Sequence, residues 1–457
     1  MPENLHVIIL AAGAGSRMRS SLPKVLQPLG HQSLIRHVLE TAQSVNPDSI
    51  HVVYGHAGEQ VRAHLADAPL QWVWQKQQKG TGHAVEHALQ QIPDDARVLV
   101  LYGDVPLLRK ETLEPVLSQP QAVLTAIVDN PTGYGRIVRQ GDAIARIVEE
   151  KDADAREKAI DEINSGILTA NALKLKKWLR QADYANQQGE KYLTDVVAIA
   201  AAEGRPFMAV PVADSDEVAG ANTMAQLADL ERIWQNRQRH KLLQAGVRMA
   251  NPESVIIRGQ VTAGCDVFLD QGVILQGQVV LEDGVSVGPY SILSDCRLSK
   301  AATVHAHSII EQAHIGPEAS VGPFARIRPG TTLGAGSKVG NFVETKQTTL
   351  GAGSKASHLS YLGDAIVGEQ VNIGAGTITC NYDGVNKHQT IIEDGAFIGS
   401  DTQLVAPVRV GKNATIGAGT TLTHDAPAEQ LTLSRVKQRH VPDWRSPRDK
   451  KAEQENS

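Results

Sequence analysis

Small residues and two cations near the N-terminus form a candidate phosphate site. Residues 10–18, LAAGAGSRM, follow the apolar run 7–10 and are expected to open a loop after a buried strand. Backbone N–H groups of small residues can approach a phosphate closely, and Arg17 adds a positive charge. Lys24, in LPKVL, can neutralise a phosphate that undergoes substitution. The glycine pattern alone also suits an ordinary turn, and it matches neither the dinucleotide fingerprint nor a Walker A loop.

A carboxylate after another apolar run is a candidate metal ligand. Asp104 follows the run 98–102. Mg²⁺ is usually held by one or two protein oxygens together with substrate phosphates, so a single aspartate is a reasonable ligand. By itself, an aspartate at a strand end is more often a cap or turn residue. The loop, the two cations and this carboxylate together favour chemistry on phosphate groups.

His358, in SHLSYLGD, is a candidate general base. Acyl transfer to an amine needs a base because an ammonium cannot attack a thioester, and imidazole changes its protonation near neutral pH. Glu344 lies upstream and is expected to orient the imidazole. Arg328 in RIRPG and Lys346 in VETK are candidate ligands of a phosphate group, the first through a forked contact and the second as a point charge.

Three other histidines allow a zinc site between subunits as an alternative. His305 and His307 lie two residues apart and would point to the same side of a strand, and His314 follows closely. The chain contains 16 histidines, so any one of them is more often structural. The residues for acyl transfer account for this part of the chain better than a metal does.

The first half of the chain has the pattern of an α/β domain. Short apolar runs at 7–10, 50–54, 98–102 and 122–128 alternate with amphipathic stretches at 33–43, 81–91 and 193–202. This alternation predicts a mostly parallel sheet covered by helices. Ligands of such sheets bind at the carboxyl ends of the strands, so the loops after Leu10 and Tyr102 are expected to form the site.

A long connecting helix is expected next. Residues 221–245 contain no glycine or proline, and Gly246 stands where a helix often ends. The predicted linker covers residues 226–246.

The second half repeats every six residues. An aliphatic side chain recurs at this spacing in three registers, and glycine often follows it. Six is a multiple of the strand period but not of the helix period, so the repeat predicts short strands stacked in a parallel β-helix. The registers break near 286–308 and 341–391, and these breaks are expected to be loops. The registers begin at Val255, Ile309 and Ile392.

Composition excludes several other classes of protein. The chain has 457 residues, of which 42% are hydrophobic and 21% charged, so it can bury a core. A net charge of −5 argues against broad nucleic-acid binding. Cys265, Cys296 and Cys380 form neither a disulfide framework nor a metal motif, which fits the reducing cytoplasm. No apolar stretch approaches the roughly 20 residues of a membrane span, so membrane insertion is not expected.

The chain resembles the bifunctional bacterial UDP-N-acetylglucosamine pyrophosphorylases/glucosamine-1-phosphate N-acetyltransferases. The resemblance covers nearly the whole chain. It implies a Rossmann-like α/β uridylyltransferase domain at 1–225, a long helical linker at 226–246 and a left-handed β-helix N-acetyltransferase domain with a C-terminal tail at 247–457. It also implies a homotrimer with acetyltransferase sites between subunits. The motifs that carry it, besides those quoted above, are QKGTGHA, YGDVPL, PTGYGRI, IVEEKDA, EINSGI, NFVETK, NIGAGTITCNYDG and GSDTQLVAP.

The resemblance implies that the N-terminal domain joins UTP to N-acetylglucosamine-1-phosphate and releases pyrophosphate. The sugar phosphate attacks the α-phosphorus, Arg17 and Lys24 stabilise the phosphate charge, and no general base is needed. Asp104 and Asn222 would bind Mg²⁺. Ala14 and Ser16 depart from the family pattern and imply a weaker hold on the triphosphate without a change of reaction. The residues implied to bind UTP and the UDP-sugar are Leu10, Ala11, Ala12, Gly13, Lys24, Gln75, Gly80, Thr81, Tyr102, Gly103, Asp104, Gly135, Glu149, Asn164 and Asn222.

For the C-terminal domain, the resemblance implies acetyl transfer from acetyl-CoA to glucosamine-1-phosphate, with His358 as the base. The two steps together would supply the precursor of peptidoglycan and lipopolysaccharide. The tail after Arg435 is either a solvated end or a contact for the anionic CoA. The residues implied to bind the amino sugar phosphate are Arg328, Lys346, Tyr361 and Asn372, and those implied to bind acetyl-CoA are Ala375, Asn381, Tyr382, Ser400, Ala418 and Arg435.

Two alternatives stay open at this level. The chain is a monofunctional nucleotidyltransferase if the β-helix serves only assembly or regulation. It is a non-catalytic scaffold if neither half reacts, although the phosphate and Mg²⁺ motifs oppose that hypothesis. The cluster at 344–382 favours two activities, because a purely structural β-helix does not need His358, Lys346 or Tyr361.

Overall fold

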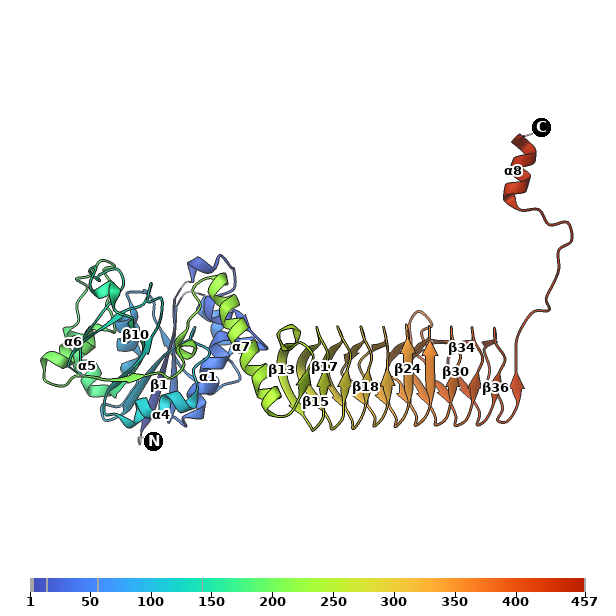
Figure 1. The fold of residues 1–457 in the computed structure, drawn as a ribbon, viewed down its shortest axis with the longest axis horizontal. Coiled ribbons are helices and arrows are strands. Elements are labelled where there is room, and N and C mark those ends of the chain that lie inside the picture. The colour runs from blue at the N-terminus through green and yellow to red at the C-terminus, as the bar shows by residue number, and fades with distance from the viewer. Residues whose placement is uncertain (1–3, 14, 56, 142, 456–457) are drawn as a thin grey trace. The chain divides into compact units, whose positions relative to one another are not determined.

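The computed structural model describes residues 4–13, 15–55, 57–141 and 143–455. The chain divides into two compact units, Met1–Gln238 and Arg239–Ser457, each with its own architecture (Figure 1). Within the described ranges, no helix has both the length and the apolar character needed to cross a bilayer.

The first unit is built on a mixed sheet with the strand order β11-β7-β10-β6-β1-β4-β5. β1 lies at its centre and pairs in parallel with β4 and β6, whereas β10 runs antiparallel to β6 and β7. The hairpin β8–β9 extends the sheet beside β10. The bounds are β1 Leu5–Ala11, β4 Ser49–Tyr54, β5 Gln71–Trp74, β6 Arg97–Tyr102, β7 Ala122–Ile127, β8 Arg136–Gln140, β9 Ala143–Val148, β10 Glu162–Asn171 and β11 Met208–Pro211. A small hairpin pairs β2 Pro28–Leu29 with β3 Gln32–Ser33.

Helices cover both faces of this sheet. In β1, Ile8 and Leu10 belong to the core that α3, α5 and α6 cover, whereas Val7 and Ile9 belong to the core under α1, α2 and α4. A strand buried on both faces can be apolar at successive positions, which is why residues 7–11 of β1 form a continuous hydrophobic run. The helices are α1 Leu34–Ser44, α2 Gly58–His64, α3 Thr81–Leu89, α4 Lys110–Ser118, α5 Ala172–Gln181 and α6 Asp195–Ala202, with short 3-10 turns at η1 Ser16–Met18, η2 Lys24–Leu26, η3 Glu157–Ala159 and η4 Ser215–Val218.

The expected connecting helix is present as α7, Met224–Gln244. Its N-terminal part packs on the first unit, where a Cβ on Gly30 would lie 2.5 Å from the Trp234 ring and where Arg237 donates to the carbonyl of Leu107 at 2.7 Å. Gly246 follows the helix at a φ of 94°, a conformation that favours glycine after a helix end.

The second unit is a parallel β-helix whose coils stack along one axis (Figure 1). Its strands form two sheets, and strands of successive coils pair in parallel. The first sheet contains β12 Arg248–Met249, β14 Phe268–Leu269, β16 Ser286–Val287, β18 Thr303–Val304, β21 Ser320–Val321, β24 Lys338–Asn341, β27 Lys355–His358, β30 Asn372–Ile373, β33 Phe397–Ile398, β36 Thr415–Ile416 and β38 Leu431–Thr432.

The second sheet supplies the other faces of the β-helix. It contains β13 Ile256–Ala263, β15 Ile274–Leu281, β17 Ile292–Leu298, β19 Ile309–Glu311, β20 His314–Ile315, β22 Arg326–Ile327, β23 Thr332–Leu333, β25 Glu344–Lys346, β26 Thr349–Leu350, β28 Tyr361–Gly363, β29 Ala365–Val367, β31 Ile378–Cys380, β32 Thr390–Ile392, β34 Gln403–Val405, β35 Val408–Val410 and β37 Thr421–Leu422. The short helix η5 Pro252–Ser254 lies between β12 and β13, and α8 Pro447–Glu455 follows β38 in the tail. The aliphatic column of the repeat is buried, as expected, and the fold class predicted from the sequence is confirmed.

The prediction of a loop at 286–308 is wrong. This segment stays in the coil, and Val287 pairs with Val304, one position earlier than three full repeats would place its partner. β15 and β17 show where one residue is lost, because Gln276 pairs with Ser294 but Val279 pairs with Cys296. Loss of one residue at a corner shifts the six-residue register without opening the coil.

The prediction of a second loop, at 341–391, is correct only in part. Strands β24 to β31 run through most of it with pairs such as Lys355 with Asn372, which again falls one position short of three full repeats. The true insertion is short: Cys380 pairs with Val405, beyond the reach of one ordinary coil, and the extra residues lie between β31 and β32. This insertion contains residues 381–389 and is called the 381–389 loop below.

Candidate active sites

The first site is a cavity of about 380 Å³ at the carboxyl ends of β1 and β6. Leu10 and Tyr102 are paired at those ends, so the loops that follow both strands open into the same space. The position agrees with the expectation for a parallel sheet. The cavity is lined by Leu10, Ala11, Ala12, Gly13, Lys24, Val25, Gln75, Gln78, Gly80, Thr81, Ala84, Tyr102, Asp104 and Glu190.

Two cations and two oxygen ligands meet at this cavity. Lys24 Nζ lies 2.6 Å from Asp104 Oδ2 and 3.2 Å from Asn222 Oδ1, and Arg17 Nη2 donates to the same amide oxygen at 3.0 Å. The Lys24 and Asp104 side chains are only 16% and 12% exposed, so their attraction is weakly screened. A Cβ on Gly15 would lie 2.7 Å from the Lys24 Cβ, so the close approach of this loop requires glycine.

The oxygens of Asp104 and Asn222 fit a shared Mg²⁺. The carboxylate oxygen of Asp104 and the amide oxygen of Asn222 both contact the Lys24 ammonium, so the two oxygens are close enough to contact a single cation. The amide N–H of Ala221 donates to the Asp104 carbonyl at 3.3 Å and brings the segment with Asn222 beside the strand end. Among the described residues, no group of three or more histidine, cysteine or carboxylate side chains could hold a metal ion. A site with two protein oxygens leaves room for phosphate oxygens, which is how Mg²⁺ is usually bound.

Gln75 and the start of α3 form one end of the cavity. The Gln75 side chain is 2% exposed, and its Nε2 donates to the Gly80 carbonyl at 3.2 Å and lies 2.9 Å from His83 Nδ1. Gly80 has a φ of 103°, and a Cβ there would lie 2.4 Å from the Lys191 carbonyl. No other residue type fits at position 80. His83 and Lys191 were not predicted from the sequence, although His83 belongs to the QKGTGHA motif.

The residues expected to bind the sugar also meet. A Cβ on Gly135 would lie 3.5 Å from Glu149 Oε2 and 3.6 Å from the Asn164 Cβ. Thr194 donates to Glu149 Oε1 at 3.0 Å. Burial raises the pKa of Glu149, and burial together with the charge of Glu149 raises the pKa of Tyr102. Tyr102 therefore stays a neutral hydrogen-bonding group.

Backbone contacts fix the remaining predicted residues of the first site. The N–H of Gly103 donates to the Leu10 carbonyl at 3.0 Å, which ties the two loops together. Thr81 Oγ1 accepts from the N–H of Leu193 at 3.0 Å. Ser16 begins η1, directly before Arg17. Ala14 lies outside the described residues.

The second site surrounds His358 on the β-helix. His358 Nδ1 lies 2.7 Å from Asn341 Oδ1, and the two residues are paired between β27 and β24. An amide oxygen only accepts, so Nδ1 carries the proton and Nε2 is left as the basic nitrogen. The expectation that Glu344 orients His358 is corrected, because Glu344 accepts from Arg328 Nη1 at 2.7 Å and Asn341 occupies the orienting position.

Three cations lie close to one another on the β-helix. Arg328 and Lys346 were predicted, and Lys387 joins them from the 381–389 loop. The neighbouring Lys387 is the main cause that lowers the pKa of Lys346, and the charge of Arg328 adds a smaller contribution. The carboxylate of Asp364 opposes this shift. Cations that lie close together without enough carboxylates suit a doubly charged phosphate. Sequence reasoning missed Lys387 because the insertion had no recognisable motif at that position.

The other predicted ligands of the sugar phosphate lie on neighbouring coils. Tyr361 pairs with Glu344 in the adjacent coil, and its hydroxyl packs so closely on Gly363 that a Cβ there would lie 2.4 Å away. Asn372 pairs with Lys355, three residues before His358 in β27. Tyr361 is therefore part of the cationic surface, while Asn372 lies further along the first sheet.

The residues expected to bind acetyl-CoA fall into two groups. Ala375, Ser400 and Ala418 occupy the same corner in three successive coils, after β30, β33 and β36. Arg435 reaches this corner from the tail, since a Cβ on Gly417 would lie 3.6 Å from its Nη2. These four residues thus form a continuous edge.

The second group is in the 381–389 loop. Asn381 donates from Nδ2 to Asp364 Oδ2, and the Tyr382 hydroxyl donates to the Gly384 carbonyl at 2.5 Å. His388 Nε2 lies 2.8 Å from Asp383 Oδ2, and this hydrogen bond closes the loop. Asn381 is therefore a buried anchor of the loop, whereas the Tyr382 ring is 61% exposed.

The three histidines of the zinc alternative do not converge within one chain. His305 hydrogen-bonds with Ser320 at 3.0 Å and His314 with Ser299 at 2.9 Å. The His307 ring is stacked between Tyr290 and Phe324, at centroid distances of 5.3 and 4.9 Å. Each ring has a partner in its own coil or its neighbour, and the described residues of a single chain give the three rings no common centre.

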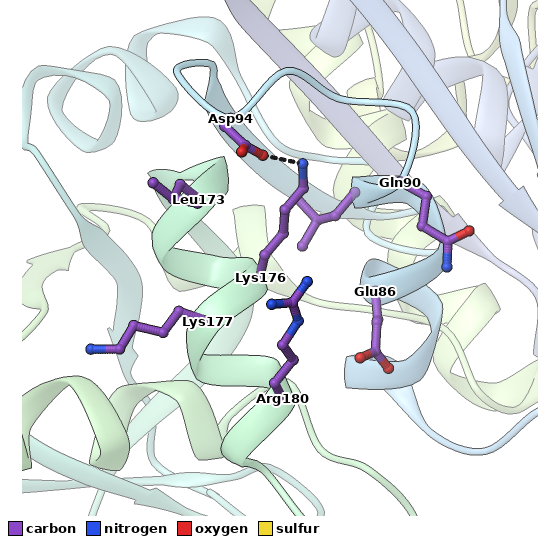
Figure 2. Close-up of a pocket in the computed structure, with 8 residues that line it drawn as sticks. Glu86, Gln90, Asp94, Leu173, Lys176, Lys177 and Arg180 are labelled. Atoms are coloured by element: carbon purple, nitrogen blue, oxygen red, sulfur yellow. Dashed lines mark hydrogen bonds and ion pairs between the residues drawn. The ribbon is translucent and has the colours of Figure 1, made fainter.

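A second hollow of about 620 Å³ lies between α3 and α5 of the first unit (Figure 2). Most of its charges are already paired, with Lys176 2.5 Å from Asp94 and Glu86 3.0 Å from Lys191. Arg180 points into the space between the helices (Figure 2). None of the residues predicted to be functional lines this hollow.

The chain matches known proteins over both units. Residues 7–165 match the MobA-like NTP transferase domain, and residues 389–424 match the bacterial transferase hexapeptide with its six repeats. "Bifunctional protein GlmU" of Alkalilimnicola ehrlichii is 52% identical over 451 residues, covering 98% of this chain and 97% of that protein. The proteins of the same name from Stenotrophomonas maltophilia and Marinobacter nauticus are 53% and 50% identical, covering 98% and 97% of this chain and 99% of each relative.

Proposed function

The chain belongs to the family of bifunctional GlmU proteins, and from this premise we propose how its two units divide the synthesis of UDP-N-acetylglucosamine. It is a bifunctional transferase with a nucleotidyltransferase domain followed by a hexapeptide acyltransferase domain. Acetyl transfer from acetyl-CoA to glucosamine-1-phosphate takes place on the β-helix. Uridylyl transfer from UTP to the acetylated product takes place in the cavity of the first unit.

In the uridylyl transfer, the N-acetylglucosamine-1-phosphate oxygen attacks the α-phosphorus of UTP and pyrophosphate leaves. Lys24 and Arg17 lie where they can bind the phosphate oxygens and stabilise the charge of the transition state. Glu149 and Asn164 hold the sugar beside Gly135. The nucleophile is already an anion, so this chain needs no base here. Asp104 and Asn222 would hold Mg²⁺, which neutralises phosphate charge when it is bound.

In the acetyl transfer, the sugar amine attacks the thioester carbon of acetyl-CoA. A C–N bond forms, the C–S bond breaks, and His358 Nε2 takes a proton from the amine nitrogen. That proton then neutralises the leaving CoA thiolate. Asn341 holds the imidazole in the required tautomer at 2.7 Å, while Arg328, Lys346 and Lys387 bind the sugar phosphate.

The observation that carries the second activity is the contact of His358 with Asn341, because it leaves Nε2 free to act as a base. The test measures CoA release and pyrophosphate release for the wild type and His358→Ala. We expect the variant to lose acetyl transfer by about 10²–10⁴-fold and to keep uridylyl transfer. His424→Ala, an exposed histidine of the same unit, is the matched control. If the wild type transfers uridylyl groups but releases no CoA, the β-helix has only a structural or regulatory role.

The homotrimer is part of this proposal. A ladder of side chains runs along one corner of five successive coils, from Tyr290 through His307, Phe324 and Phe342 to Leu359, and its large apolar members are 49–61% exposed. An apolar stripe of this length supports an interface between copies of a three-sided β-helix. Light scattering of the wild type should give three times 49.1 kDa. Phe342→Ser should lower that mass, and a monomeric wild type would contradict the trimer.

We propose that the protein acts in the cytoplasm, because its substrates are found there. UTP, acetyl-CoA and the sugar phosphates are small anions of the cytoplasm, and the three free cysteines suit a reducing compartment. Neither a nucleic acid nor a membrane is required for either reaction.

A further inference from the structure

One hydrogen-bonding group of Gln75 has no partner among the residues that the structure describes. Its backbone N–H donates to the Tyr54 carbonyl at 2.9 Å, and its backbone carbonyl accepts from Gln78 Nε2 at 3.2 Å. Its side-chain Nε2 donates to the Gly80 carbonyl at 3.2 Å and faces His83 Nδ1 at 2.9 Å. Within the described ranges no hydrogen bond to Gln75 Oε1 is recorded. Oε1 is therefore the group that this cavity-lining residue offers to a ligand.

The two acceptors fix which way the Gln75 amide points. A carbonyl oxygen cannot donate, so the side-chain atom next to Gly80 must be the NH₂ group. That NH₂ group then requires His83 Nδ1 to be an acceptor, with its proton on Nε2. His83 Nε2 lies 3.2 Å from His87 Nε2 and can donate to it, which completes a consistent chain from Gln75 to His87. Burial and the neighbouring His87 lower the pKa of His83, so the ring stays neutral at neutral pH.

We propose that His83 is a positioning residue for base selection, which turns Gln75 Oε1 toward the base and so favours a pyrimidine whose ring N3 carries a proton. Uracil has N3–H and can donate to Oε1. Cytosine has a lone pair at N3, which would face the Gln75 oxygen without a proton between them. A site built to accept one hydrogen bond rejects an analogue that cannot make it, because its own polar group is left unpaired. This inference rests on the proposed uridylyl transfer and deepens it.

Removal of the His83 acceptor should weaken the selection. Without Nδ1, only the Gly80 carbonyl still holds the NH₂ group of Gln75, and the amide can rotate to present NH₂ to the base. That orientation suits cytosine N3. His83→Leu removes the acceptor at similar size, and His83→Asn places Oδ1 near the position of Nδ1. His31→Leu is the matched control, since it removes an exposed histidine of the same unit that contacts neither Gln75 nor His83.

The experiment measures kcat and KM for UTP and for CTP with N-acetylglucosamine-1-phosphate, and the affinity of both nucleotides by calorimetry. We expect His83→Leu to lower the UTP-to-CTP ratio of kcat/KM about tenfold or more, mainly through KM. His83→Asn should restore most of the ratio, and His31→Leu should stay within about twofold of the wild type.

Three outcomes overturn the inference. These are an unchanged ratio in His83→Leu, an equal loss in His31→Leu, and a wild type that does not distinguish UTP from CTP. The proposed function fails separately, if the wild type binds UTP in preference to CTP but forms no UDP-sugar. In that case the calorimetric ratio for the variants still decides the role of His83.

Discussion

Lys24 lies 2.6 Å from Asp104 and bridges it to Asn222, which comes from a distant part of the chain. A lysine from the loop after β1, an aspartate at the end of β6 and an amide from the segment before α7 thus meet at one point. The ammonium is held by the oxygens that would face Mg²⁺, so it is positioned before any substrate arrives. Preorganised charge of this kind is the main means of catalysis when the nucleophile needs no activation.

Lys24→Ala should reduce uridylyl transfer by about 10²–10³-fold, because one preorganised charge on the phosphates is lost. Pyrophosphate release measures this step, and CoA release by the same sample measures the other. Acetyl transfer should stay within about twofold of the wild type. Lys177→Ala, which removes a lysine of the same unit whose side chain is 61% exposed, serves as the control. Retention of more than a tenth of the uridylyl transfer would show that Lys24 is not part of the reaction.

Asn341 should control acetyl transfer through His358. Asn341→Leu removes the acceptor at Nδ1 and should lower kcat at least about tenfold, because the imidazole loses its preferred tautomer and orientation. Asn341→Asp keeps an acceptor but adds a negative charge, which stabilises the imidazolium and moves the acid limb of the pH–rate profile to higher pH. A purely structural role predicts no such displacement, so identical pH profiles for the wild type and Asn341→Asp would reject this role.

Lys387→Ala should raise the KM for glucosamine-1-phosphate about tenfold or more and change kcat little. A charge-assisted hydrogen bond to the phosphate is lost before the reacting amine is involved. Initial rates of CoA release at varied sugar phosphate measure the effect. Lys412→Ala is the matched control on the same unit, and equal KM values for Lys387→Ala and wild type would place the phosphate elsewhere.

The elements that could be predicted from the sequence are those with a clear pattern of apolar residues. The apolar runs of β1 and β6 and the six-residue repeat each follow from burial, so both architectures could be derived. The cavity at the ends of β1 and β6 followed from the fold class. The position of Asn222 beside Asp104 did not, because it depends on a contact between distant segments, and only the family resemblance indicated it.

The partner of His358 could not be predicted for a different reason. Asn341 lies one shortened coil before His358, and the loss of one residue hides the six-residue register at this place. A coil of three full repeats would not pair these two positions. Glu344 is a carboxylate upstream of His358 and was therefore the expected partner of the imidazole. In the structure it is paired with Tyr361 in the sheet and with Arg328 through its side chain. Lys387 lies in an insertion, where no repeat indicates which residue faces the site.

The buried pair His6 and His51 should make the first unit sensitive to acid. The two rings are stacked with His6 Nδ1 3.0 Å from His51 Nε2, and burial followed by the charge of His6 lowers the pKa of His51 from 6.5 to about 4. The unfolded chain therefore binds a proton between pH 6.5 and 4 that the folded unit excludes. Stability from this group is complete above pH 6.5 and is lost as the pH falls toward 4, by roughly 3 kcal/mol.

Urea unfolding monitored by tryptophan fluorescence measures this loss, since four of the five tryptophans belong to the first unit. His51→Gln removes the titrating ring, so its free energy of unfolding should fall less between pH 7 and 4.5 than that of the wild type. His424→Gln, an exposed histidine of the other unit, should keep the wild-type slope. Parallel slopes for His51→Gln and the wild type would show that carboxylates and other histidines cause the acid sensitivity, because a buried neutral imidazole must add its own proton uptake to the unfolded state.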